Sequence, residues 1–225
     1  LHGFNYLGIT IMSFTFGICA VFLAYAISKA SRLNTTLSLV LAGIMVSSLF
    51  SAGTSFIKLI ADTQDQLPAI TYWLMGSLTS IRGGDALFVS VLVIISLIPL
   101  FLLRWRINLL TISEDEAKSL GINTGRLRFI VIICSTLMTA AAVSVSGMIG
   151  WVGLVIPHFC RLIFGYDYRR LIPSSILLGA AFMILVDDLA RTVTTSEIPL
   201  GVLTAFVGAP VFVWLILRGG SDHEN

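Results

Sequence analysis

The sequence is poor in charged residues. Asp, Glu, Lys and Arg make up 12% of its 225 residues, whereas hydrophobic types make up 56%. An ordinary soluble domain carries about 25% charged residues, so this chain has too few to cover a water-facing surface of its size. The composition therefore argues against a soluble globular protein, a nucleic-acid binder and a disordered chain.

Catalytic motifs and paired cysteines are missing as well. The sequence contains no P-loop, no G-x-S-x-G and no H-E-x-x-H motif, so neither an ATP site nor an enzyme activity is predicted. Cys19, Cys134 and Cys160 lie in apolar runs, which indicates buried thiols rather than a disulfide framework. His158 and Cys160 have no third ligand nearby, which favours burial over metal binding. We predict no catalytic residue, no metal site and no cofactor.

What the sequence does contain is a series of long apolar runs. A transmembrane helix needs about 20 residues, and continuous rather than alternating hydrophobicity excludes a closed barrel. We therefore predict an all-α polytopic bundle that forms a single transmembrane domain over residues 1–225. The expected spans, about seven, are 6–28, 36–59, 86–104, 128–146, 148–164, 171–191 and 201–218. The run 148–164 is close to the lower length limit and is expected to be irregular or tilted.

Basic residues are distributed unevenly between the connections. Eleven of the 14 lie in alternate connections and the C-terminal segment, namely Lys29, Arg32, Arg104, Arg106, Lys118, Arg126, Arg128, Arg161, Arg169, Arg170 and Arg218. The opposite connections hold only Lys58, Arg82 and Arg191. Because cytoplasmic loops are enriched in Lys and Arg, we predict a multi-pass protein of the inner (plasma) membrane with a cytoplasmic C-terminus.

The longest cytoplasmic connection, residues 105–127, carries the signals of a short surface helix. Ser113 is a candidate N-cap, and Glu116 three residues later completes a capping box. Gly121 suits the left-handed residue that ends a helix. A solvated linker helix and a docking surface for a cytoplasmic partner are both compatible with this pattern.

Charges also occur near the outer end of the sixth run. Asp187 and Arg191 are four residues apart, and Asp188 and Arg191 are three apart, so either acid can pair with the arginine on one helix side. Charges inside a span are candidates for function, but a structural pair that reaches the interface is the alternative. The outer segment 61–85, with Tyr72 and Trp73, fits an interfacial anchor or a binding vestibule.

Small residues recur at a spacing of four in two of the runs. They are Gly43, Ser47 and Ser51 in the second run, and Gly201, Ala205 and Ala209 in the last. This spacing lets helix backbones approach closely. Packing within the chain and a seam between two copies are equally consistent with it.

Several strings together resemble one family. They are 41–43 (Leu-Ala-Gly), 72–77 (Tyr-Trp-Leu-Met-Gly-Ser), 114–121 (Glu-Asp-Glu-Ala-Lys-Ser-Leu-Gly), 147–158 (Gly-Met-Ile-Gly-Trp-Val-Gly-Leu-Val-Ile-Pro-His), 185–191 (Leu-Val-Asp-Asp-Leu-Ala-Arg) and 198–210 (Ile-Pro-Leu-Gly-Val-Leu-Thr-Ala-Phe-Val-Gly-Ala-Pro). In this order they resemble the FecCD-type permeases, the membrane subunits of type II ABC importers for iron–siderophore, haem, vitamin B12 or molybdate. The resemblance extends over the whole chain and corresponds to spans four to ten of a ten-span permease. We therefore expect the N-terminal third of such a permease to be absent from this sequence.

The resemblance implies partners and residue roles. The partners are a second permease copy, two cytoplasmic ATPase subunits and an extracytoplasmic substrate-binding protein, all in lipid and without nucleic acid. The ATPase-coupling positions would be Glu114, Ala117 and Gly121, and the position that docks the binding protein would be Arg191. The pathway and its gate would include Thr35, Thr36, Gly201, Ala205 and Gly208.

The sequence departs from the family pattern at a few positions. The common G-P-I-G-F string is replaced by Gly-Met-Ile-Gly-Trp at 147–151, and Asp188 stands where an apolar residue is usual. The implied function is translocation of a metal chelate of the iron–siderophore, haem or cobalamin class. A molybdate-type oxyanion importer of the same family and an ATP-independent secondary transporter are the alternatives.

Overall fold

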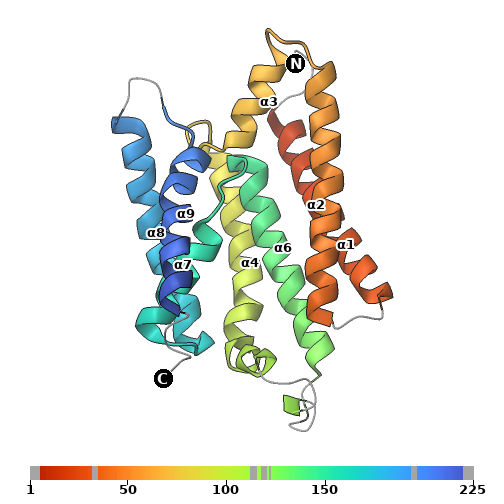
Figure 1. Ribbon diagram of the computed structural model, residues 1–225, viewed down its shortest axis with the longest axis vertical. Helices are drawn as coiled ribbons and strands as arrows, with labels where there is room; N and C mark the ends of the chain where they lie inside the picture. The colour runs from red at the N-terminus through yellow and green to blue at the C-terminus, as the bar shows by residue number, and fades with distance from the viewer. Residues whose placement is uncertain are drawn as a thin grey trace.

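The computed structural model describes residues 6–31, 35–111, 116–117, 121, 123–193 and 197–219, and all regular elements in them are helices. They are α1 (Tyr6–Ala30), α2 (Thr35–Ile60), α3 (Gln66–Met75), α4 (Gly83–Ile107), the 3-10 turn η1 (Asn108–Leu110), α6 (Thr124–Ser146), α7 (Val152–Phe164), α8 (Tyr168–Thr192) and α9 (Leu200–Gly219). The predicted all-α class is confirmed (Figure 1).

Five of these helices are long and apolar enough to cross a membrane. The candidate spans are Gly8–Ala30, Leu37–Ile60, Gly83–Leu110, Thr124–Ser146 and Tyr168–Thr192. Two shorter apolar helices, Val152–Phe164 and Leu200–Val213, account for the other predicted runs. Within the expected run 148–164, only Val152–Phe164 forms a helix, and residues 148–150 are not helical. At about 1.5 Å per residue, α7 falls short of the roughly 30 Å hydrocarbon core.

The helices form one bundle with two flanks. Helices α4 and α6 pack against each other in the middle, α1 packs on both α2 and α6, and α8 packs on α4 and α7. Figure 1 places α1 and α2 on one flank and α8 and α9 on the other. The buried core is small, with one cluster of Leu100, Ile107, Leu127 and Cys134 between α4 and α6. Many large apolar side chains point outward, as expected for helices surrounded by lipid.

The basic connections gather at one end of this bundle. In Figure 1 the end of α1, the end of α4, the start of α6 and the α7–α8 turn all lie at the lower end. The end of α2, the start of α4 and the end of α8, which carry Lys58, Arg82 and Arg191, lie at the upper end. The described basic residues are therefore sorted to the two ends as the sequence predicts.

Helix α3 was not predicted as a helix. The sequence suggested only an outer connection over residues 61–85, but Gln66–Met75 forms ten residues of helix. Its proline, Pro68, occupies the first turn, where no intrahelical N–H is needed. The contacts of α3 with α9 place this helix beside the start of the last one.

Candidate functional site

The end of α3 joins two other chain segments through backbone hydrogen bonds. Ser77 N donates to Ser146 O at 2.8 Å, which ties α3 to the end of α6. Leu200 N donates to Gly76 O at 2.9 Å, which ties α3 to the start of α9. Three segments distant in sequence therefore meet at the upper end of the bundle.

Glycine is required at this junction because the backbones almost touch. A Cβ on Gly147 would overlap Trp73 O, and a Cβ on Gly201 would overlap Met75 O. A Cβ on Gly76 would lie 2.6 Å from Met148 O. Gly76 and Gly147 also have φ values of +73° and +69°, which L side chains rarely adopt. We call Gly76, Gly147 and Gly201 the glycine junction.

An apolar groove opens beside the glycine junction, between α3, residues 148–151 and α9. It has a volume of about 600 Å³ and is lined by Leu74, Met75, Met148, Gly150, Trp151, Gly201, Val202, Ala205 and Phe206. None of these lining residues carries a charge. The volume falls within the range of small-molecule sites, roughly 300–1,000 Å³.

Trp151 forms part of the groove wall in an unusual backbone conformation. Its φ of +68° is the only positive value at a non-glycine position among the described residues. Such conformations cost about 1–3 kcal/mol and persist where the surroundings hold them. Gly208 of α9 makes room for the Trp151 side chain, since a Cβ at position 208 would lie only 2.5 Å from Trp151 Cβ. The indole also packs at 6.1 Å from the Phe212 ring centroid.

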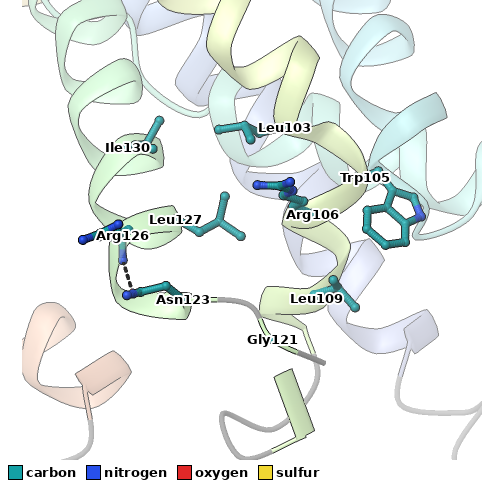
Figure 2. A pocket seen from close by; sticks show the side chains of 9 residues that line it. All are labelled: Leu103, Trp105, Arg106, Leu109, Gly121, Asn123, Arg126, Leu127 and Ile130. Carbon is teal, nitrogen blue, oxygen red and sulfur yellow. Dashed lines mark hydrogen bonds between the residues drawn. The ribbon is translucent and has the colours of Figure 1, made fainter. Parts of the chain in front are cut away.

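A second cavity lies at the basic end of the bundle, where α4 ends and α6 begins (Figure 2). It measures about 660 Å³, and its lining residues are Leu103, Trp105, Arg106, Leu109, Gly121, Asn123, Arg126, Leu127 and Ile130. Asn123 caps α6, because its side-chain oxygen accepts a hydrogen bond from Arg126 N at 3.0 Å. The predicted coupling segment therefore borders a hollow rather than a flat surface.

The predicted coupling residues are described only in part. Gly121 has a φ of +75°, which confirms the expected left-handed position. Ala117 is completely buried, with 0% exposure. Glu114 and the candidate N-cap Ser113 lie outside the described residues.

Asn108 links the end of α4 to the start of α8. Its Nδ2 donates to Asp167 Oδ1 at 2.7 Å, and its Oδ1 accepts from Tyr168 N at 2.8 Å. Asp167 is the N-cap of α8 and also accepts from Arg169 N at 2.9 Å. The bonds from Arg169 N and from the Asn108 amide lower the pKa of the Asp167 carboxyl below its ordinary value.

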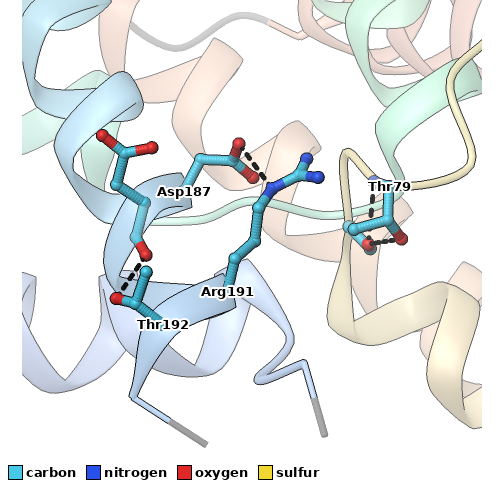
Figure 3. Close-up of polar contacts among 6 residues, drawn as sticks. Thr79, Asp187, Arg191 and Thr192 are labelled. Carbon is cyan, nitrogen blue, oxygen red and sulfur yellow. Dashed lines mark hydrogen bonds and ion pairs between the residues drawn. The ribbon is translucent and has the colours of Figure 1, made fainter. Parts of the chain in front are cut away.

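The predicted ion pair at the opposite end of α8 is present (Figure 3). Arg191 Nε donates to Asp187 Oδ2 at 2.9 Å, so Asp187 rather than Asp188 is the partner. The Arg191 side chain is 43% exposed and that of Asp187 is 23% exposed. The arginine is therefore partly exposed at the surface while Asp187 holds its orientation.

The predicted pathway residues fall into two separate groups. Gly201, Ala205 and Gly208 share one side of α9, where the first two line the apolar groove. Thr35 and Thr36 begin α2 at the other end of the bundle. Helix α2 packs mainly on α1, whereas α9 packs on α7, α8 and α3, so a single chain does not bring the two groups together.

Sequence reasoning missed some residues of these sites. Met148 and Trp151 attract attention in the sequence only because they depart from the G-P-I-G-F string. No local sequence pattern predicts that these two residues line a groove. The pairing of Asn108 with Asp167 joins residues 59 positions apart, and nothing in the sequence pattern indicates it.

Comparison with known proteins places these features in a family. The FecCD transport family matches the chain over residues 1–218. The chain is 40% identical over 224 residues to the molybdate import system permease protein MolB of Haemophilus influenzae, and this match covers 98% of the chain and 66% of the relative. It is 44% identical over 210 residues to a probable iron chelatin transport system permease protein of Helicobacter pylori, covering 93% of the chain and 64% of the relative.

A solved structure of similar sequence also has a similar fold. It is described as an inward-facing conformation of a metal-chelate type ABC transporter, and it matches with a TM-score of 0.90 at 40% identity. The match covers 96% of this chain and 69% of the solved one, and the chain spans about two thirds of the length of the two curated relatives. Since both the family match and the shared helical fold extend over nearly all of its residues, the chain belongs to the FecCD transport family.

Proposed function

We propose that this protein is the transmembrane permease subunit of an ATP-binding-cassette importer that carries a metal chelate across the inner membrane. The observation that carries the proposal is the likeness to a metal-chelate type ABC transporter, at 40% identity and a TM-score of 0.90 over 96% of the chain. The permease provides the pathway, and a partner subunit hydrolyses ATP.

Seven crossings are part of this proposal. Helix α7 and the non-helical residues 147–150 together form one crossing, and α9 forms another. The arrangement in Figure 1 supports this, because α6 ends at the upper end while α7 ends and α8 begins at the lower one. With 20 residues, α9 is long enough for a span of about 30 Å.

The partners are assigned to opposite ends of the bundle. Two ATPase subunits dock on the 105–127 connection at the basic, cytoplasmic end, with Glu114, Ala117 and Gly121 as coupling positions. A binding protein docks at the other end through acidic groups that reach the exposed Arg191. The C-terminus is cytoplasmic, as the distribution of basic residues favours.

A second permease copy completes the pathway between two chains. The support is the outward side of α2, where an added Cβ on Gly43 or Gly53 would meet no atom within 4 Å. Thr35 and Thr36 form the cytoplasmic gate, and the α9 residues Gly201, Ala205 and Gly208 line the route to it. ATP binding shifts the pair between inward- and outward-open states through contacts that differ between the two states.

One observation favours a different cargo. The Haemophilus relative, 40% identical, is named for molybdate import. A metal chelate remains the better fit because the groove lining is apolar, and an apolar wall offers a small dianion no compensation for lost hydration.

The proposal is tested by uptake into vesicles that contain the full-length permease with its ATPase and its binding protein. We expect ferric chelate to accumulate with ATP and not with a non-hydrolysable analogue. Gly121→Val should reduce uptake per ATP hydrolysed about tenfold, because a β-branched side chain at positive φ costs at least 1–2 kcal/mol of backbone energy and reshapes the docking turn.

The matched control is Gly165→Val in the α7–α8 turn, outside the 105–127 connection. Gly165 also has a positive φ, +81°, and an added Cβ would meet no atom within 4 Å. Its coupling should stay within about twofold of wild type. Uptake driven by an ion gradient in vesicles lacking the ATPase would instead identify a secondary transporter.

A further inference from the structure

A further groove lies on the outer flank of the bundle, between the end of α7 and the first half of α8. It has a volume of about 660 Å³, and Figure 1 places α8 at the edge of the bundle, on the flank away from α1 and α2. Arg169 and Arg170 line the groove at the basic end, and the remaining lining residues are apolar except for Ser174. We call this surface the α7–α8 groove.

The groove follows one face of α8 from the basic end towards the middle of the bundle. Arg170, Ser174, Leu177 and Ala181 all line it, and their spacing of four, three and four residues places them above one another on the helix. At about 1.5 Å per residue this stripe rises roughly 16 Å, which is close to half of the roughly 30 Å hydrocarbon core. The groove therefore has the depth of one membrane leaflet.

The walls of the groove are open to the surroundings. Phe164 of α7 is 46% exposed and Leu177 of α8 is 73% exposed, and both line the groove. Apolar side chains at this depth of a spanning helix suit contact with hydrocarbon rather than with water. A flexible acyl chain can therefore enter the groove from the side.

The two arginines at the mouth of the groove keep their capacity to bind an anion. Neither Arg169 nor Arg170 forms an ion pair with any residue that the structure describes. The Arg169 guanidinium lies 6.0 Å from the Trp105 ring centroid, and such a contact uses its flat face while the N–H donors lie at its edge. The neighbouring acid, Asp167, already accepts hydrogen bonds from the Asn108 amide and from Arg169 N.

We propose that the α7–α8 groove is a binding site for an anionic phospholipid of the leaflet at the basic end. Arg169 and Arg170 hold the phosphate, and one acyl chain follows the stripe as far as Ala181. The charge favours an anionic headgroup, since basic pockets between spanning helices attract anionic lipids. This site is separate from the proposed transport function, because it involves neither the cargo nor the ATPase subunits.

The headgroup contact is tested by measuring the first lipid bound to the full-length permease with native mass spectrometry. The probes are phosphatidylglycerol and phosphatidylcholine with identical acyl chains, so that only the headgroup differs. Wild type should bind phosphatidylglycerol more tightly. Arg170→Gln should weaken phosphatidylglycerol binding about fivefold and phosphatidylcholine binding less than about twofold, because one basic residue near a membrane surface contributes about this much.

The control for charge alone is Lys29→Gln. Lys29 is an exposed cation in the last turn of α1, at the same end of the bundle but on the opposite flank. Its loss should change the affinity for phosphatidylglycerol less than about twofold.

The acyl-chain contact is tested separately at the deep end of the groove. Ala181→Trp fills the groove and should weaken the binding of both lipids about fivefold, because several methylene groups lose their buried contacts. The matched control is Ala180→Trp, since Ala180 is also exposed on α8 but does not line the groove. This variant should stay within about twofold of wild type.

Three results would overturn the proposed lipid site. Equal wild-type affinity for the two lipids would show that the headgroup charge is not recognised. Equal losses in Arg170→Gln and Lys29→Gln would reduce the preference to the overall charge of that end. Displacement of phosphatidylglycerol by free glycerol phosphate, which carries the anion without an acyl chain, would identify a phosphate site instead. Each of these results is independent of whether vesicles show ATP-dependent uptake.

Discussion

At the scale of single residues, Asn108 joins the end of α4 to the start of α8. Its partners Asp167 and Tyr168 lie 59 and 60 positions away in the sequence. The packing of α4 on α8 brings these groups together.

The Asp167 contact predicts a pH dependence of stability. Hydrogen bonds from Arg169 N and from the Asn108 amide hold the folded-state pKa of Asp167 below its ordinary value of 3.8. The stabilisation is therefore complete above pH 3.8 and is lost as the pH falls through the lower, folded-state pKa. Asp167→Asn should lower the unfolding temperature of the detergent-solubilised protein at pH 6, and this difference from wild type should disappear in acid.

The control for this prediction is Asp65→Asn at the start of α3. Asp65 is also an N-cap, but its side chain makes no capping hydrogen bond, so we expect little change at any pH. A difference between Asp167→Asn and wild type that stays constant as the pH falls would contradict a role for the ionised carboxylate.

At the scale of elements, apolar run length located the long helices and failed for the short ones. Five predicted runs became candidate spans of 23 to 28 residues, because a predominantly apolar segment of that length has little alternative to a helix in lipid. Helix α3 ends, and the segment that leads to α7 begins, at the glycine junction. There, close backbone contacts with other segments outweigh local propensity, and such contacts leave no periodic signal in the sequence.

The glycine junction predicts large effects of very small substitutions. In Gly147→Ala the new methyl group would overlap Trp73 O, and the residue would remain at a φ of +69°. We expect a loss of at least about 2 kcal/mol in the free energy of unfolding, since both steric overlap and left-handed strain contribute. Unfolding in mixed micelles measures this quantity.

The matched control is Gly84→Ala in the first turn of α4. An added Cβ there meets no atom within 4 Å, and the backbone is helical. Alanine should stabilise the helix by up to about 1 kcal/mol. Comparable destabilisation by both alanines would show that the junction has no special requirement for glycine.

At the scale of the whole molecule, the two ends differ in charge while the sides are apolar. Basic residues of the described segments gather at the end where α4 ends and α8 begins, and few lie at the end of α3. This charge distribution was predictable from the sequence, because successive connections between spanning helices lie at opposite ends of the bundle. The depth and shape of the grooves were not predictable, because they arise from helices α3, α7 and α9 packing at a distance in sequence.

The charge asymmetry predicts the orientation in the membrane, and single cysteines can test it. Thr63→Cys lies in the α2–α3 turn at the less basic end, and Tyr166→Cys lies in the α7–α8 turn, where the native side chain is 78% exposed. In a Cys19→Ala background, the remaining Cys134 and Cys160 are buried and should not react. Because basic loops are retained in the cytoplasm, an impermeant maleimide applied to spheroplasts should label position 63 and spare position 166. Permeabilised cells should label both positions, which controls for intrinsic reactivity. Labelling of position 166 alone in intact spheroplasts would reverse the orientation and contradict the proposed docking of ATPase subunits on the 105–127 connection.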